Sequence, residues 1–95
     1  MEYNLKINIR ATFEIQDSYN YYQLKSSGLA RRFLKTVEEY LEKIKQNPKH
    51  FQIKRAEIRK AYLRKFPFII VYEIVNDTII IYSVFHTNRN PTEKK

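Results

Sequence analysis

The chain has 95 residues, a length that fits a single domain running from residue 1 to residue 95 and leaves no room for a second. It has no cysteine and only two histidines, His50 and His86, so disulfides and thiolate chemistry are excluded, and we expect no metal and no other cofactor. A net charge of +8 favours acidic partners, such as nucleic acids or acidic proteins.

The sequence predicts a cytoplasmic protein that does not enter a membrane. Its first ten residues alternate between polar and apolar types and lack the apolar run of a secretion signal. The longest apolar stretches, 66–72 and 79–82, are far below the roughly 20 residues that a membrane helix needs.

The first half of the chain predicts one strand and two helices. Alternating apolar residues predict a strand over 2–9, and apolar residues at steps of three and four from Ala11 to Tyr22 predict the first helix. We expect this helix to stop at Ser26-Ser27-Gly28, with Gly28 in a left-handed conformation. A second apolar stripe, from Ala30 to Ile44, predicts an antiparallel second helix that ends at Asn47-Pro48.

The second half predicts three strands. After a connecting stretch that contains Phe51 and Ile53, β-prone runs cover 57–63, 68–74 and 78–85, and Val75-Asn76-Asp77 predicts a tight hairpin between the last two. The resulting order is strand, helix, helix, strand, strand, strand. It predicts an α+β fold in which a two-helix antiparallel hairpin packs on one face of a four-stranded, mostly antiparallel sheet.

The opposite face of the sheet and a basic segment are the candidate binding surfaces. We expect that face to be partly polar and concave and to carry Arg59, Arg64 or Tyr82. Between Lys43 and Lys65 the chain has nine lysines and arginines and one acidic residue, Glu57. Such a segment is either a solvated face or a surface for phosphates or carboxylates. The candidate target- or phosphate-binding residues are Lys54, Arg55, Arg59, Lys60, Arg64, Lys65, Tyr82, His86 and Arg89.

Several short motifs follow one another along nearly the whole chain. They are Tyr21-Tyr22, Gly28-Leu29-Ala30-Arg31-Arg32-Phe33, Asn47-Pro48, Leu63-Arg64-Lys65-Phe66-Pro67-Phe68, Val71-Tyr72, Val84-Phe85-His86 and Arg89-Asn90-Pro91. In this order and at this chain length they resemble the RelE/ParE toxin superfamily. The resemblance implies the toxin of a type II toxin-antitoxin module, silenced by a cognate antitoxin that we expect to be acidic and partly disordered.

The superfamily has two main activities, and the resemblance implies either of them. RelE-like members cut messenger RNA in the ribosomal A site, whereas ParE-like members poison DNA gyrase without nuclease chemistry. Metal-independent cleavage needs a base, cations near the phosphate and an acid. The candidates are Glu57 as base, Arg59 and Arg64 as phosphate ligands, His86 as acid, and Tyr72 or Tyr82 to stack a base.

Two departures weaken the nuclease interpretation. Ile69 and Ile70 stand where many RelE-like nucleases carry an arginine, and Thr87 follows His86 where an aromatic or basic residue is usual. The Phe66-Pro67-Phe68 run and the chain ending resemble the plasmid-stabilisation branch instead. Gyrase inhibition is therefore the first hypothesis, and ribosome-dependent cleavage is the alternative. A non-toxic nucleic-acid-binding module is the third, and another target or a decayed toxin stays open, as does the oligomeric state.

Each candidate also has a purely structural interpretation. His86 could instead cap the Asn90-Pro91 turn, and Glu57 could pair with a neighbouring arginine. Tyr72 and Tyr82, on adjacent predicted strands, could be cross-strand neighbours whose packing steadies the sheet, and they could stack a base only if they point away from the helices.

Overall fold

The computed structural model describes residues 2–55 and 57–87, with only the backbone described for 52–55. The elements, in chain order, are β1 Asn4–Ile7, α1 Ile9–Lys25, α2 Ser27–Gln46, the 3-10 helix η1 Pro48–His50, β2 Gln52–Arg55, β3 Ile58–Tyr62, β4 Phe68–Val75 and β5 Thr78–His86. They form one sheet in the order β1-β5-β4-β3-β2, in which β1 is parallel to β5 and the other neighbours are antiparallel.

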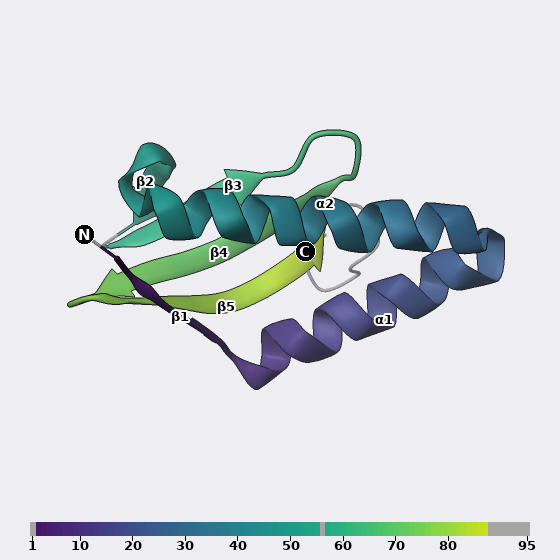
Figure 1. Ribbon diagram of the computed structural model, residues 1–95, viewed down its shortest axis with the longest axis horizontal. Coiled ribbons are helices and arrows are strands. Elements are labelled where there is room, and N and C mark those ends of the chain that lie inside the picture. Colours follow the sequence, from purple (N-terminus) through teal and green to yellow (C-terminus); the bar gives the residue numbers. More distant parts are fainter. Residues whose placement is uncertain (1, 56, 88–95) are drawn as a thin grey trace.

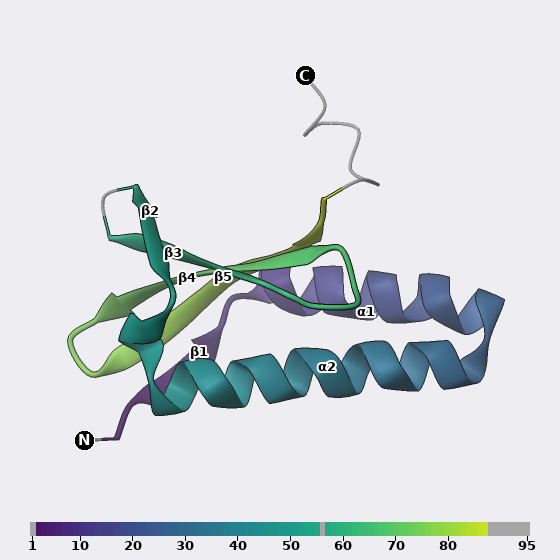
Figure 2. The same ribbon diagram turned by 90° about the horizontal axis from the view of Figure 1, so that it is seen from above.

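The predicted α+β architecture is confirmed, because both helices lie on one side of a mostly antiparallel sheet (Figures 1 and 2). All four predicted strands are present. A further short strand, β2, extends the sheet within the stretch predicted as a connection. The first strand is shorter than predicted because Asn8 already caps α1, its side-chain oxygen accepting a hydrogen bond from the Arg10 amide at 2.9 Å.

The turn between the helices is built differently from the prediction. Ser26 is extended, with φ −172° and ψ 130°, and it serves both helices. Its amide donates to the Tyr22 carbonyl at 2.9 Å, and its hydroxyl accepts from the Leu29 amide at 3.3 Å. Gly28 lies in the first turn of α2 and has no positive φ, so the predicted left-handed glycine is wrong. Because Ser26 caps both helices, the turn does not need a residue in the left-handed conformation.

Two other turns do use the left-handed region. Asn76 has φ 58° in the turn that joins β4 to β5, which confirms the predicted tight hairpin. Lys65 has φ 70° in the loop that joins β3 to β4. Pro67 in that loop lacks an amide hydrogen, and its carbonyl accepts from the Thr87 amide at 2.9 Å, so the loop is tied to the end of β5.

An aromatic cluster holds the helices on the sheet. Phe33 of α2 lies 4.8 Å from Phe68 of β4 and 5.6 Å from Phe66, measured between ring centroids, and Tyr22 of α1 lies 5.3 Å from Phe33. All four rings are buried. Aromatic pairs at these separations add about 0.5–1.5 kcal/mol each beyond the area that they bury. The cluster therefore joins both helices to the start of β4.

Glu14 of α1 completes an edge of the sheet. Because β1 ends at Ile7, which pairs with Ile81, the next part of β5 has no strand beside it on that side. The Glu14 carboxylate takes this place, accepting hydrogen bonds from the Val84 amide at 2.8 Å and the Ser83 hydroxyl at 2.7 Å.

A second set of contacts fixes the segment after α2. Tyr72 of β4 is fully buried, and its hydroxyl donates to the Pro48 carbonyl. Arg59, its partner on β3, donates through Nη1 to the carbonyls of Phe51 at 2.7 Å and Lys49 at 3.3 Å. Burial raises the pKa of Tyr72 to about 12, and the nearby Arg59 charge opposes part of this rise.

We predict that Glu14→Ala lowers the free energy of unfolding by about 1–3 kcal/mol, because the buried Val84 amide loses its acceptor. Asp17→Ala, which removes an exposed carboxylate from the same helix, is the matched control and should cost less than about 0.5 kcal/mol. Urea denaturation measures both variants. Equal losses in the two would show that Glu14 does not support the edge of β5.

We also predict a loss of stability at alkaline pH that depends on Tyr72. The unfolded tyrosine releases its proton near pH 10 and the folded one near 12, so the free energy of unfolding falls as the pH rises above about 10. The loss is of the order of 2 kcal/mol by about pH 12. Tyr72→Phe should flatten this decline in urea denaturation curves, whereas Tyr62→Phe, at an exposed tyrosine, should keep it. An unchanged decline in Tyr72→Phe would contradict the assignment.

Candidate functional site

The sheet face that points away from the helices, here named the open sheet face, is largely apolar and aromatic. Strand pairing places Lys60 opposite Val71, Tyr62 opposite Ile69, and Glu73 opposite both Ile58 and Ile80. Its members on the central strands are Ile58, Lys60, Tyr62, Ile69, Val71, Glu73, Ile80, Tyr82 and Phe85.

The described side chains of the three central strands carry few charges on the open sheet face, and Lys6 of β1, which pairs with Ile80, adds a cation at its edge. Lys60 and Glu73 are its only charged side chains in the described part of β3, β4 and β5. The Tyr82 hydroxyl donates to Glu73 Oε1 at 2.7 Å, and this hydrogen bond raises the pKa of Tyr82, so the phenol stays protonated. The expectation that Tyr82 lies on this face therefore agrees with the structure, and the face is less polar than expected.

Arg59 and Tyr72 face the helices and not the open sheet face. The two residues pair across β3 and β4, and Tyr72 is completely buried in the core. The interpretation of Tyr72 as a residue that stacks a base is therefore wrong. The reason is its place in the alternation of β4, which turns the ring toward the helices. Arg59 points the same way, to the carbonyls after α2.

The predicted acid, base and phosphate ligands lie at both ends of the sheet. Arg64 and Lys65 follow β3, and His86 ends β5, where it pairs with Phe68 and its ring lies 4.9 Å from the Phe68 ring. Hydrogen bonds from Leu63 to Phe68 and from Thr87 to Pro67 bring these two segments together. Glu57 precedes β3 instead, so at about 3.3 Å per residue it lies roughly 20 Å from Arg64.

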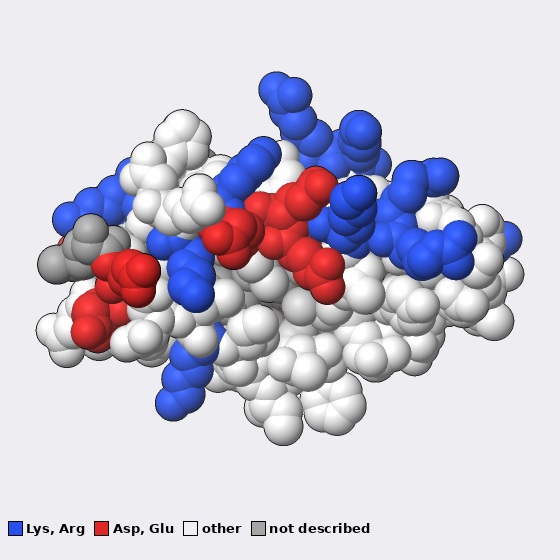
Figure 3. All heavy atoms as spheres, in the orientation of Figure 1, with Lys and Arg blue, Asp and Glu red and all other residues white. Residues whose placement is uncertain are grey.

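The fold adds basic residues of α2 to the loop that carries Arg64 and Lys65. Arg32, Lys35 and Lys65 line one pocket of about 460 Å³ together with Glu39. Figure 3 shows cationic groups over the first half of α2 and the neighbouring loop, acidic groups along the middle of α2, and few charges over α1. Arg32 and Lys35 were not among the predicted binding residues, although their i, i+3 spacing places them on one side of a helix.

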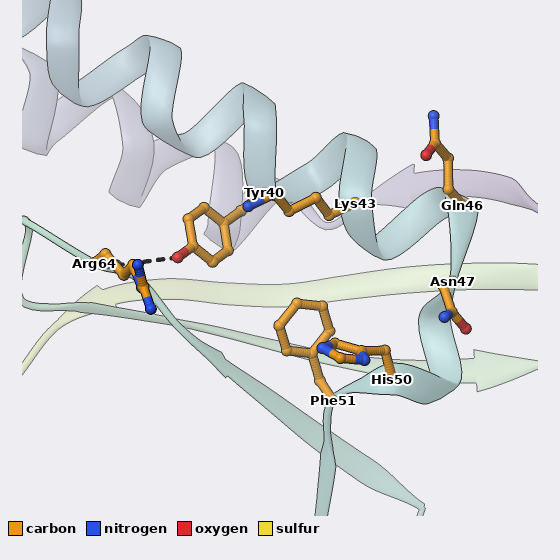
Figure 4. Close-up of a pocket in the computed structure, with 7 residues that line it drawn as sticks. All are labelled: Tyr40, Lys43, Gln46, Asn47, His50, Phe51 and Arg64. Carbon is orange, nitrogen blue, oxygen red and sulfur yellow. Dashed lines mark hydrogen bonds between the residues drawn. The ribbon is translucent and has the colours of Figure 1, made fainter.

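A second pocket, of about 510 Å³, lies between α2, η1 and the loop after β3 (Figure 4). The Tyr40 hydroxyl accepts a hydrogen bond from the Arg64 amide at 3.2 Å, which joins its two sides. The rings of His50 and Phe51 meet edge to face at 5.0 Å. Its lining residues are Tyr40, Lys43, Gln46, Asn47, His50, Phe51 and Arg64.

Three of the predicted binding residues cannot be placed among the described side chains. The side chains of Lys54 and Arg55 and the whole of Arg89 lie outside the part of the chain that the structure describes. Over the described residues, no three of the side chains that commonly bind metals come together as a metal site. None of the helices described is both long and apolar enough to span a membrane.

The comparisons with known proteins agree with this fold. The chain shares its fold with the chromosomal ParDE toxin-antitoxin system from P. aeruginosa, with a TM-score of 0.67 at 18% identity over 90% of this chain and 96% of that one. It is also similar to the isolated E. coli RelE toxin, with a TM-score of 0.66 at 16% identity over 97% of this chain and 92% of that one. No curated protein sequence matches it.

A family model described as the ParE toxin of the type II toxin-antitoxin system parDE matches residues 5–91. This range includes both helices, the strands β2 to β5, all of β1 except Asn4, and the residues that line the two pockets described above. The chain therefore belongs to the ParE toxin family of type II toxin-antitoxin systems.

Proposed function

We propose that the chain arrests growth by binding and inhibiting DNA gyrase through its open sheet face, without cutting RNA, and that it acts in the cytoplasm. Membership of the family makes it the toxin of a type II toxin-antitoxin module with a cognate antitoxin. The structural neighbours include both a ParDE system and a RelE toxin, so the mode of action has to be argued from the residues.

The observation that carries the proposal is the composition of the open sheet face. The buried centre of a protein interface is rich in aromatic and apolar residues and poor in charge. Tyr62, Val71 and Phe85 give the open sheet face this character, and the Glu73 carboxylate already accepts a hydrogen bond from Tyr82. A surface that binds RNA carries several cations that face the phosphates, and the described side chains of β3, β4 and β5 supply one to this face, Lys60.

The positions of the catalytic candidates also support binding over cleavage. A base, a phosphate ligand and an acid must surround one ribose and its phosphate. Glu57 lies at the opposite end of β3 from Arg64 and His86, and Arg59 Nη1 donates to two main-chain carbonyls on the helix side. The described residues do not place these four groups around one phosphate.

We further propose that the antitoxin is acidic and docks on the helices. Ile9, Phe13 and Leu24 of α1 are 73%, 70% and 89% exposed, which is unusual for large apolar side chains. These residues lie on one helix of the hairpin, and the other helix, α2, carries Arg31, Arg32 and Lys35. An amphipathic segment with acidic residues beside its apolar face would match both surfaces. The helix side would then hold the antitoxin and leave the open sheet face to the target.

We predict that the purified chain inhibits gyrase supercoiling and that Tyr62→Ala weakens this inhibition at least about tenfold, because a large aromatic side chain leaves the interface. Tyr62 is 52% exposed on the open sheet face. Tyr21→Ala removes an equally large exposed ring from α1 and is the matched control, with an expected change of less than about twofold.

The same variants should be expressed without antitoxin while the 5′ ends of messenger RNA are mapped. Growth arrest with intact messages supports the proposal. New 5′ ends in translated messages, lost in His86→Ala and Arg64→Ala, would replace it with ribosome-dependent cleavage. Salt-sensitive binding to nucleic acid without any arrest would leave a non-toxic nucleic-acid-binding module.

A further inference from the structure

The pocket between α2, η1 and the loop after β3 has cationic side chains without acidic partners. Lys43 and Arg64 line it, and no carboxylate is among its lining residues. In the described part of the chain, the side chains of Lys43 and Arg64 form no ion pair, and the only ion pair joins Arg10 to Glu14. Lys43 Nζ lies 4.7 Å from the centre of the Tyr40 ring, which holds the ammonium group at the edge of the pocket.

Main-chain carbonyls around the pocket would repel an anion, but five of them already have a hydrogen-bond donor. The carbonyls of Lys43 and Asn47 accept from the Asn47 and His50 amides. Those of Lys49 and Phe51 accept from Arg59, and that of Pro48 accepts from the Tyr72 hydroxyl. Arg59 thereby places another positive charge next to the η1 segment that lines the pocket. The Arg59 charge offsets part of the negative end of α2.

Aromatic rings form the rest of the pocket. Figure 4 shows the Tyr40 ring between α2 and Arg64, with its hydroxyl toward the Arg64 amide, and the rings of Phe51 and His50 beside each other below α2. An unstacked base packs well against such rings, and an amide side chain such as that of Asn47 can pair with its polar edge. The volume of about 510 Å³ lies within the range of small-ligand sites.

We propose that this pocket binds a nucleotide, with its phosphate between Lys43 and Arg64 and its base against Phe51. The phosphate accounts for the two cations without a counter-charge, and the base accounts for the aromatic wall. The nucleotide is either a free mononucleotide or the 5′-phosphorylated end of a single strand, which share this chemistry. The site lies on the helix side of the sheet and is separate from the proposed gyrase-binding face, so neither proposal depends on the other.

The test is a titration of the isotope-labelled full chain followed by amide NMR shifts, with adenosine monophosphate, ribose 5-phosphate and inorganic phosphate as ligands. We expect adenosine monophosphate to shift the amides of Tyr40, Lys43, His50, Phe51 and Arg64, and to bind at least about fivefold tighter than ribose 5-phosphate because its base stacks. Lys43→Gln should weaken binding about five- to tenfold. Lys45→Gln has the same charge change on the same helix turn outside the pocket, and it should leave the affinity unchanged.

A 5′-phosphorylated single-stranded oligonucleotide separates the two sources. Binding much tighter than that of the mononucleotide, with the same shifted amides, assigns the pocket to the end of a strand. Equal affinity assigns it to free nucleotides. Equal binding of all three phosphate ligands would overturn the assignment of a base site. Equal effects of Lys43→Gln and Lys45→Gln, or shifts spread over Arg31, Arg32 and Lys35, would reduce the binding to a general attraction to a basic surface.

Discussion

The contact of Phe33 with Phe66 and Phe68 determines which sheet face is covered. Tyr22 of α1 packs against Phe33 and so brings the other helix into the same contact. These rings join α1, α2 and the start of β4 in one buried cluster. Because each helix has only one side that can be buried against the sheet, the hairpin cannot also protect the opposite face. The open sheet face therefore remains apolar and aromatic, with Tyr62 exposed on it, and the helices keep their charges and the exposed apolar side chains of α1 on the outside.

This arrangement separates three surfaces on a chain of 95 residues. The open sheet face suits a protein target, the outer side of the helices suits an acidic antitoxin, and the pocket beside Tyr40 suits a phosphate with a base. Arg59 shows that a cation of the basic segment can have a structural role in the fold. It carries charge within a basic segment of the sequence, yet its position opposite Tyr72 commits Nη1 to the carbonyls of Lys49 and Phe51, where it supports the wall of the pocket.

The sequence was sufficient for both helices and four of the five strands, but not for the directions of the side chains. The apolar stripe of α2 and the β-prone runs predicted the helices, the four strands and the Asn76 turn, because periodicity reports which positions are buried. The prediction of a left-handed Gly28 was wrong because the Ser26 side chain caps the turn, and periodicity does not reveal a capping side chain. The short strand β2 has too few residues to show alternation. Whether Arg59 and Tyr72 face the helices depends on strand register, and the proximity of Lys65 to α2 depends on tertiary packing.

The division between an antitoxin side and a target side can be tested by placing a photo-crosslinking amino acid at position 62 or position 24. Position 62 is on the open sheet face, and position 24 is the most exposed apolar site of α1. With the free toxin in cells, position 62 should cross-link to a gyrase subunit. With the antitoxin present, position 24 should cross-link to the antitoxin. Cross-links from position 62 to messenger RNA or to ribosomal proteins would contradict the account and assign the open sheet face to ribosome-dependent cleavage.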